Sequence, residues 1–192
     1  MFVAVIPPVE ALEDLDEFWS VRREAAGFRW TLPEQWHLTL AFLADVPDRH
    51  YDDLVARLER AAAKRTAMTA SIAGAGAFPG PGRAKVLWAG VRTDAAEELR
   101  RLAVGCRAAA SKAGVDVGGD RFRPHLTLAR MGRPVEATRW IRVGETYRGP
   151  EWSVDRISLV ASHLGEGPRG RPRYEVLDEF RLRSVPLNAP NP

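Results

Sequence analysis

The tetrapeptide His-Leu-Thr-Leu occurs twice in this chain of 192 residues, at positions 37–40 and 125–128. A histidine side chain, whose unperturbed pKa is near ~6.5, can accept or donate a proton at neutral pH. A threonine hydroxyl two residues further on can donate a hydrogen bond to an anionic oxygen. Two such pairs acting on one phosphodiester would supply a base for the attacking oxygen, an acid for the leaving oxygen and donors for the phosphate.

The spacing within each repeat is that of a strand with one buried face. Side chains alternate between the two faces of a strand, so His37 and Thr39 share one face and the leucines take the other. The same holds for His125 and Thr127. For a single such motif we would favour a structural explanation, in which the histidine is hydrogen-bonded on a half-buried strand and the threonine is a good strand former. Its repetition in matched contexts instead predicts two His/Thr pairs that face one cleft.

Other chemistries have little support in the sequence. The single cysteine, Cys106, excludes intramolecular disulfides and cysteine-rich zinc sites, and we interpret it as a core residue of a helix. Threonine is a poor metal ligand and no HExxH or zinc-type spacing is present, so we expect no metal and no cofactor. His50 and His163 lack a threonine partner at the same spacing, and we expect them to be structural or incidental.

Composition indicates a soluble globular protein, with 45% hydrophobic and 28% charged residues. No apolar run approaches the ~20 residues needed to span a bilayer, and the N-terminus lacks the pattern of a signal peptide, so we expect a cytoplasmic location. The chain has 25 arginines and 3 lysines with a formal net charge of +3. Arginine suits phosphate binding, but this excess is also explained by a biased genome composition.

Hydrophobic periodicity predicts alternating strands and helices around the two repeats. Strands are expected at 2–6, 36–43, 68–78, 84–91, 125–130, 154–164 and 173–183, and helices at 9–27, 48–65, 94–113 and 135–143. Asp48 is the candidate N-cap of the second helix. The order of elements in the first half echoes that in the second. We therefore expect one domain over 1–184, made of two pseudo-symmetric lobes, and a flexible tail over 185–192.

Several stretches together resemble one family over nearly the whole chain. They are "FVAVIPP", "WHLTLAFL", "GAFPGPGRAKVLWAGV", "RPHLTLAR" and "LVASHLGEGPRGRPRYEVLDEFRL". In this order and spacing they are similar to the bacterial and archaeal RNA 2',3'-cyclic phosphodiesterases, also called 2'-5' RNA ligases or LigT-like proteins, of the two-histidine phosphoesterase superfamily. The hallmark of that family is a pair of H-x-T-x motifs.

The resemblance implies a duplicated α+β fold with antiparallel sheets lining a central cleft and helices packed outside. It implies hydrolysis of RNA 2',3'-cyclic phosphate ends to a 2'-phosphomonoester, with His37 as proton donor, His125 as proton acceptor, and Thr39 and Thr127 as phosphate-binding partners. The motif residues alone do not decide which histidine is the acid.

The predicted partners are RNA ends or cyclic nucleotides as substrate, with no membrane, and the expected state is a monomer. Alternatives are hydrolysis or ligation of 2'-5' linkages, hydrolysis of small cyclic nucleotides, and RNA-end binding without catalysis.

Residues near the motifs are candidates for substrate binding. Arg130 follows the second motif, but strict alternation would turn it away from His125, so contact with phosphate requires a bulge or strand end there. Phe122, Trp30 and Trp36 are candidate platforms for a base, with core packing as the alternative, which we favour for Trp36. The basic stretches 121–124 and 167–173 are candidates for a positive rim.

Overall fold

The computed structural model describes residues 1–25, 27–119 and 122–184. The predicted flexible tail, 185–192, lies outside the described residues. Helices and strands alternate along the chain as follows: β1 (Phe2–Val5), α1 (Val9–Arg23), β2 (Arg29–Trp30), η1 (Pro33–Gln35), β3 (Leu38–Leu43), α2 (Asp48–Ala62), β4 (Met68–Phe78), η2 (Pro81–Arg83), β5 (Ala84–Thr93), α3 (Ala96–Lys112), β6 (Val117–Gly118), β7 (His125–Val135), α4 (Thr138–Glu145), β8 (Arg148–Val154), β9 (Arg156–His163), η3 (Pro168–Gly170) and β10 (Arg173–Arg181).

The strands form two five-stranded sheets, ordered β10-β9-β1-β3-β6 and β8-β4-β5-β7-β2, in which neighbouring strands are antiparallel. The two motif strands, β3 and β7, occupy the same place in the two sheets, and a two-residue strand lies beside each of them. These short strands are exchanged: β2 precedes β3 in the chain but pairs with β7, whereas β6 precedes β7 but pairs with β3. The exchange ties the two motif strands together.

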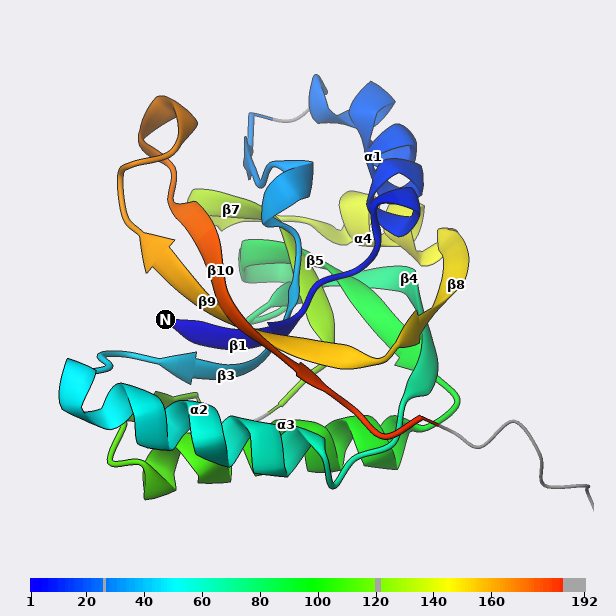
Figure 1. Cartoon of the computed structure of the whole chain (residues 1–192). Helices are drawn as coiled ribbons and strands as arrows, with labels where there is room; N and C mark the ends of the chain where they lie inside the picture. Colours follow the sequence, from blue (N-terminus) through cyan, green and yellow to red (C-terminus); the bar gives the residue numbers. More distant parts are fainter. Residues whose placement is uncertain (26, 120–121, 185–192) are drawn as a thin grey trace, which may run out of the picture.

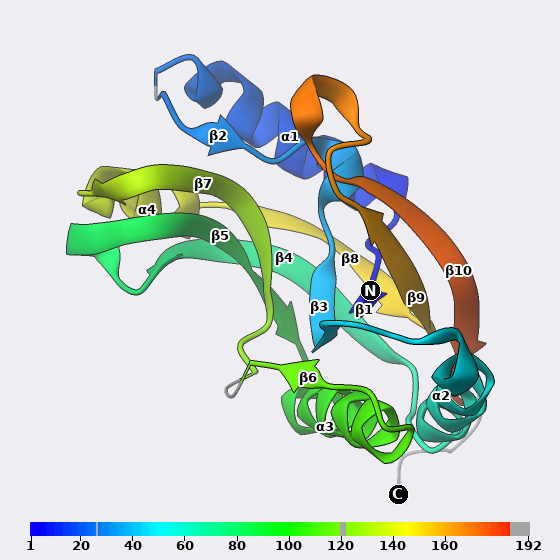
Figure 2. The same cartoon turned by 90° about the vertical axis from the view of Figure 1, so that its left-hand side faces the viewer.

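Helices cover the outer faces of the sheets (Figures 1 and 2). Helices α2 and α3 lie side by side along the first sheet, and α1 and α4 pack against β8 and β4 of the second. Their buried leucines, which include Leu15, Leu54, Leu58 and Leu102, join the strand residues in the main hydrophobic core. The predicted α+β fold with antiparallel sheets and outer helices is confirmed.

Strand β1 shows how burial separates the two faces of the first sheet. Val3 and Val5 belong to the main core, whereas Phe2 and Ala4 form a small separate cluster with Val160. The apolar residues on both faces explain why this strand reads as a continuous hydrophobic run. One face therefore supports the helices, and the other is available to line a cavity.

Several predicted boundaries differ from those in the structure. Helix α1 ends at Arg23, before the glycine expected to stop it, and Asp48 is the first residue of α2 because Pro47 takes the cap position. Strands β2, β6 and β8 were not predicted. The first two are too short to show a period, and β8 contains Gly149 and Pro150, which disfavour strands.

A search of the described residues finds no helix whose length and apolar character would let it cross a bilayer.

Candidate active site

His37 lies between the short helix η1 and strand β3, where the local backbone fixes its ring. Its Nδ1 donates a hydrogen bond to the carbonyl oxygen of Gln35 at 2.8 Å. Gln35 is itself fixed, because its side-chain Nε2 donates to the carbonyl oxygen of Pro172 at 2.6 Å. A carbonyl oxygen can only accept, so Nδ1 carries the proton and Nε2 of the neutral ring is the free acceptor.

His125 begins strand β7 and repeats the same arrangement. Its Nδ1 donates to the carbonyl oxygen of Arg123, two residues earlier, at 2.7 Å. Both histidines thus have the same tautomer and the same relation to the preceding backbone. In the described part of the chain, neither Nε2 has a hydrogen-bond partner. In both rings, Nε2 is therefore the nitrogen that remains available to exchange a proton with a bound molecule.

Aromatic side chains hold the two imidazoles in place. The ring of His37 stacks on Phe2 with centroids 4.4 Å apart, and the edge of Tyr174 meets it at 5.4 Å. His125 packs edge to face with Phe78 at 5.0 Å and lies 6.1 Å from Trp88. These contacts restrict ring rotation, so each Nε2 keeps its direction without a second hydrogen bond.

The two motifs meet at one cavity of about 480 Å³ between the sheets. His37, Thr39, His125 and Thr127 all line it, as the strand pattern predicted. The other residues of its wall are Phe2, Arg29, Trp30, Thr31, Gln35, Phe42, Arg130, Ser162, Leu164, Gly165, Gly170, Arg171, Pro172 and Tyr174. One His/Thr pair at the start of β3 and another at the start of β7 therefore face the same cavity.

A bulge in each motif strand changes which residues face the cavity. Between β5 and β7 the register shifts so that Leu87 opposes Ala129 and Trp88 opposes Thr127, which leaves Leu128 as an extra residue. Leu128 and Ala129 are consequently both buried, and Arg130 turns to the face of His125 and Thr127. The bulge that a role for Arg130 required is thus found.

Strand β3 has the equivalent irregularity. Val3 opposes Ala41 and Ala4 opposes Thr39, so Leu40 is the extra residue. Phe42, which corresponds to Arg130 in the second repeat, therefore lines the cavity and is 56% exposed. The two repeats thus place an arginine and a phenylalanine at matching positions on the cavity.

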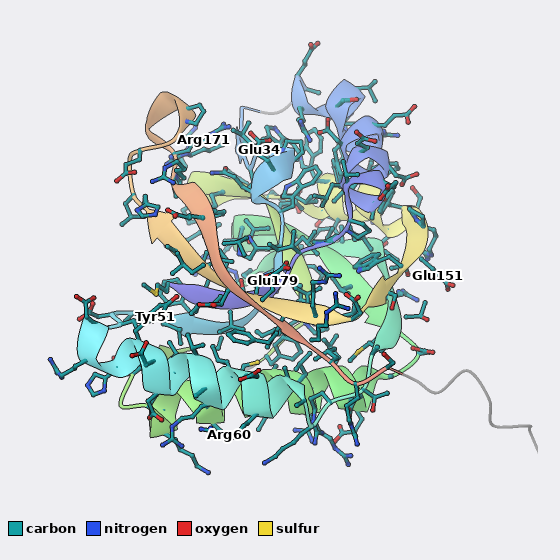
Figure 3. All side chains as sticks on the ribbon, viewed as in Figure 1. Glu34, Tyr51, Arg60, Glu151, Arg171 and Glu179 are labelled. Carbon is teal, nitrogen blue, oxygen red and sulfur yellow. The ribbon has the colours of Figure 1, made fainter. Side chains whose placement is uncertain are left out.

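The cavity is strongly cationic. Arg29, Arg130 and Arg171 line it, and none of the described lining residues is a carboxylate. Arg29 and Arg130 are directly opposed across the β2·β7 pair, an arrangement of like charges that normally destabilises a sheet. Figure 3 labels Arg171 on the connection between β9 and β10, within the predicted basic stretch 167–173. Such clustered, unneutralised guanidinium groups favour an anionic ligand.

Burial and charge both favour the neutral form of the histidines. Desolvation is the main cause that lowers the pKa of His37 to about 4, and the charges of His125 and Arg130 lower it further against the opposing effect of the Gln35 carbonyl. Desolvation also lowers the pKa of His125, with Arg130 and Arg123 contributing. The two histidines are therefore close enough to interact, and an anion would raise both pKa values.

This burial predicts a specific loss of stability in acid. The unfolded chain binds a proton at His37 below about pH 6.5, whereas the folded protein binds it only near pH 4. The free energy of unfolding should therefore fall as the pH decreases through this window. Urea unfolding of wild type and His37→Gln at several pH values should show a shallower decline in the variant. Parallel declines would contradict the assigned burial.

The other predicted residues fall into different surroundings. Trp30 lines the cavity, whereas Trp36 is buried in the core, the alternative that we favoured from the sequence. Phe122 does not line the cavity and packs against the main core, so the structure gives no support to its predicted role in substrate binding.

Cys106 is a buried free thiol whose pKa is raised to about 12 by burial, which fits a core residue. His163 pairs with Glu175 and His50 contacts Arg49, and neither histidine lines the cavity. Phe2, Phe42 and Tyr174 are cavity residues that sequence reasoning missed.

Within 1–25, 27–119 and 122–184, no group of three or more His, Cys, Asp or Glu side chains is arranged to hold a metal ion.

Comparison with known proteins gives a consistent result for this fold and cavity. Residues 7–166 match the model of the 2'-5' RNA ligase superfamily. The chain belongs to this superfamily. An RNA 2',3'-cyclic phosphodiesterase of Thermus thermophilus is 36% identical over 189 residues, which cover 95% of this chain and 90% of that protein.

Solved structures agree with the membership. A crystal structure of a protein from Thermus thermophilus has a TM-score of 0.76 and 32% identity, and the match covers 95% of this chain and 97% of the other. The structure of Escherichia coli LigT complexed with 3'-AMP has a TM-score of 0.74 and 27% identity over 94% and 96% of the two chains. The LigT-like resemblance drawn from the motifs is thereby confirmed.

Proposed function

We propose that this chain is an RNA 2',3'-cyclic phosphodiesterase that opens the cyclic phosphate to a 2'-phosphomonoester by acid-base catalysis. The observation that carries the proposal is the pair of matched imidazoles, each fixed through Nδ1 and with Nε2 free, at one cationic cavity. The activity named for its relatives at 30–36% identity supports the same substrate class.

The reaction requires two proton transfers at one phosphorus. Nε2 of His125 takes a proton from water as the water oxygen bonds to phosphorus, and the bond from phosphorus to the 3'-oxygen breaks. Nε2 of His37 gives its proton to that 3'-oxygen, which leaves as a hydroxyl. The product keeps the phosphate on the 2'-oxygen. The order of roles follows the family resemblance, and the geometry supplies one imidazole from each sheet.

The phosphate itself is the ligand that explains the charge of the cavity. The hydroxyls of Thr39 and Thr127 and the guanidinium of Arg130 would hold its non-bridging oxygens, where negative charge increases in the transition state. The bound anion would also raise the pKa of His37 from about 4 toward neutrality, which allows it to carry the proton that it donates. Phe42 offers an exposed ring for the adjoining base.

Arg130 provides a test of the phosphate site. Arg130→Ala should weaken the binding of a ribonucleoside 2'-monophosphate about 10- to 100-fold, the value of a hydrogen bond between charged groups. The loss should be larger at low salt, because screening is then weaker. Calorimetric titration measures both effects, with Arg139→Ala on the exposed face of α4 as control. Equal affinities of wild type and Arg130→Ala would assign Arg130 a structural role.

The proposed activity is tested with an oligoribonucleotide that ends in a 2',3'-cyclic phosphate. The expected product is a 2'-phosphate end, identified by chromatography against both phosphate isomers. Because we propose that the protons and donors come from side chains, the rate should persist after exhaustive chelation. Activity that disappears with a chelator and returns with a divalent ion would overturn this mechanism, as would a 3'-phosphate product.

A further inference from the structure

A second hollow lies on the outside of the molecule, between helices α2 and α3. It has a volume of about 400 Å³. Its floor contains small residues, among them Ala61, Gly105 and Ala108, and a side-chain atom added at Gly105 would meet Ala61 at 3.8 Å. The close approach of the helices leaves a shallow channel between them. We call this channel the α2–α3 groove.

The banks of the α2–α3 groove are cationic on both sides. Seven basic side chains line it, and no described lining residue is acidic: Arg57, Arg60, Lys64, Arg65, Arg100, Arg101 and Lys112. Arg57 and Arg60 lie three residues apart on one face of α2, and Lys64 lines the groove from the turn that follows the helix. In Figure 3, Arg60 is labelled on the side of α2 away from the sheet, far from Arg171 at the cavity.

Only part of this charge is neutralised. Asp53 pairs with Arg57, Glu98 with Arg65, and Glu97 with both Arg100 and Arg101. Arg60, Lys64 and Lys112 are exposed and have no ion-pair partner among the described residues. Seven cations and three paired carboxylates leave a net charge of +4, whereas the whole chain carries +3. The groove is therefore a second concentration of positive charge, in addition to the cavity.

We propose that the α2–α3 groove binds the phosphate backbone of RNA, separately from the cavity that binds the RNA end. Guanidinium and ammonium groups spaced along two banks fit a chain of phosphates, which binds by charge without base recognition. The first sheet separates the groove from the cavity, because Phe2 lines the cavity while α2 and α3 pack on the other face of that sheet. The proposal rests on the proposed function only in naming RNA as the polyanion.

The groove then extends recognition beyond the terminal nucleotide. An RNA whose end occupies the cavity and whose body passes round the edge of the first sheet would be attracted by the positive charge of both sites. A minimal substrate, such as a dinucleotide with a cyclic phosphate, would be attracted only by the charge of the cavity. We therefore expect the groove to determine the affinity for long RNA and to leave the turnover of the minimal substrate unchanged.

Binding to RNA without a cyclic phosphate tests the groove independently of catalysis. The triple variant Arg60→Gln, Lys64→Gln, Lys112→Gln should bind a single-stranded RNA of about 20 nucleotides with a 3'-hydroxyl end at least ten-fold more weakly than wild type. The slope of log affinity against log salt should decrease by about 2, at ~0.7 for each lost phosphate contact. A control triple variant, Lys85→Gln with Arg139→Gln and Arg142→Gln, removes three exposed cations elsewhere. It should bind the same RNA as tightly as wild type.

The lysines of the native protein allow a second measurement that needs no variant. Lys64 and Lys112 line the groove, and Lys85, the remaining lysine of the chain, does not. RNA should protect Lys64 and Lys112 from an amine-acylating reagent and leave Lys85 reactive, as read by mass spectrometry. Protection by anionic lipid vesicles but not by RNA would overturn the proposal in favour of a membrane surface.

The groove and the active site can fail independently. Equal affinity of wild type and the groove variant for the 3'-hydroxyl RNA, or equal acylation of all three lysines with and without RNA, would overturn the groove proposal whatever the catalytic result. Conversely, absence of hydrolysis of a cyclic-phosphate dinucleotide by wild type would overturn the proposed function and leave the binding results to decide the groove.

Discussion

His125→Ala and His37→Ala should each lower the turnover of a cyclic-phosphate RNA by on the order of 10²–10⁴, or roughly 3 to 5 kcal/mol of barrier. Each imidazole presents a free Nε2 to the same cavity, and the described lining residues include no carboxylate and no third histidine that could take over a proton transfer. Because both act on one transition state, the double variant should lose less than the product of the single losses. Single-turnover rates measured at saturating enzyme check this.

The controls for this experiment are available in the same chain. His50→Ala removes a histidine that lies outside the cavity and should keep the wild-type rate. Thermal unfolding of each variant separates lost chemistry from lost structure, since His37 also stacks on Phe2. Near wild-type hydrolysis by a folded His37→Ala or His125→Ala protein would show that the repeated motif is architectural.

Thr39→Val with Thr127→Val should be the next most damaging change. Valine has nearly the shape of threonine and fits the strand, but it lacks the hydroxyl that we assign to the non-bridging oxygens. Loss of one such donor costs about 10²–10³ in turnover in a preorganised site. The double variant should therefore lose at least 10²-fold in kcat, with a smaller change in KM.

Serine offers a conservative counterpart at the same positions. Thr39→Ser with Thr127→Ser keeps both hydroxyls and should retain most of the rate. If the valine and serine variants lost the same activity, the hydroxyls would have no part in catalysis and the threonines would serve only the strand.

The sequence predicts the elements that carry the catalytic pairs because their signal is local. Leucines alternate with polar residues in both motifs, and the leucines are indeed buried while His37, Thr39, His125 and Thr127 face the cavity. The chemistry follows from residue types at fixed spacing. These features depend on a few consecutive residues, so they can be read without knowing the fold.

The rest of the site depends on contacts between distant segments. Arg130 reaches the cavity only through the bulge at Leu128, and the bulge depends on pairing with β5. Tyr174 contacts His37 from strand β10, more than 130 residues further along the chain. The carbonyl of Pro172, the residue just before β10, accepts the hydrogen bond that fixes Gln35. Phe122 shows the reverse case, because it lies close to the second motif in sequence but does not line the cavity.

The assignment of one histidine to each proton transfer is tested most directly with a substrate whose 3'-bridging oxygen is replaced by sulfur. A thiolate, with a pKa near ~8.5 for an ordinary thiol, leaves without protonation, whereas an alkoxide does not. The account predicts that His37→Ala recovers most of its rate on the sulfur substrate, while His125→Ala remains as impaired as on the oxygen substrate. Recovery by His125→Ala instead, or equal impairment of both variants on both substrates, would contradict it.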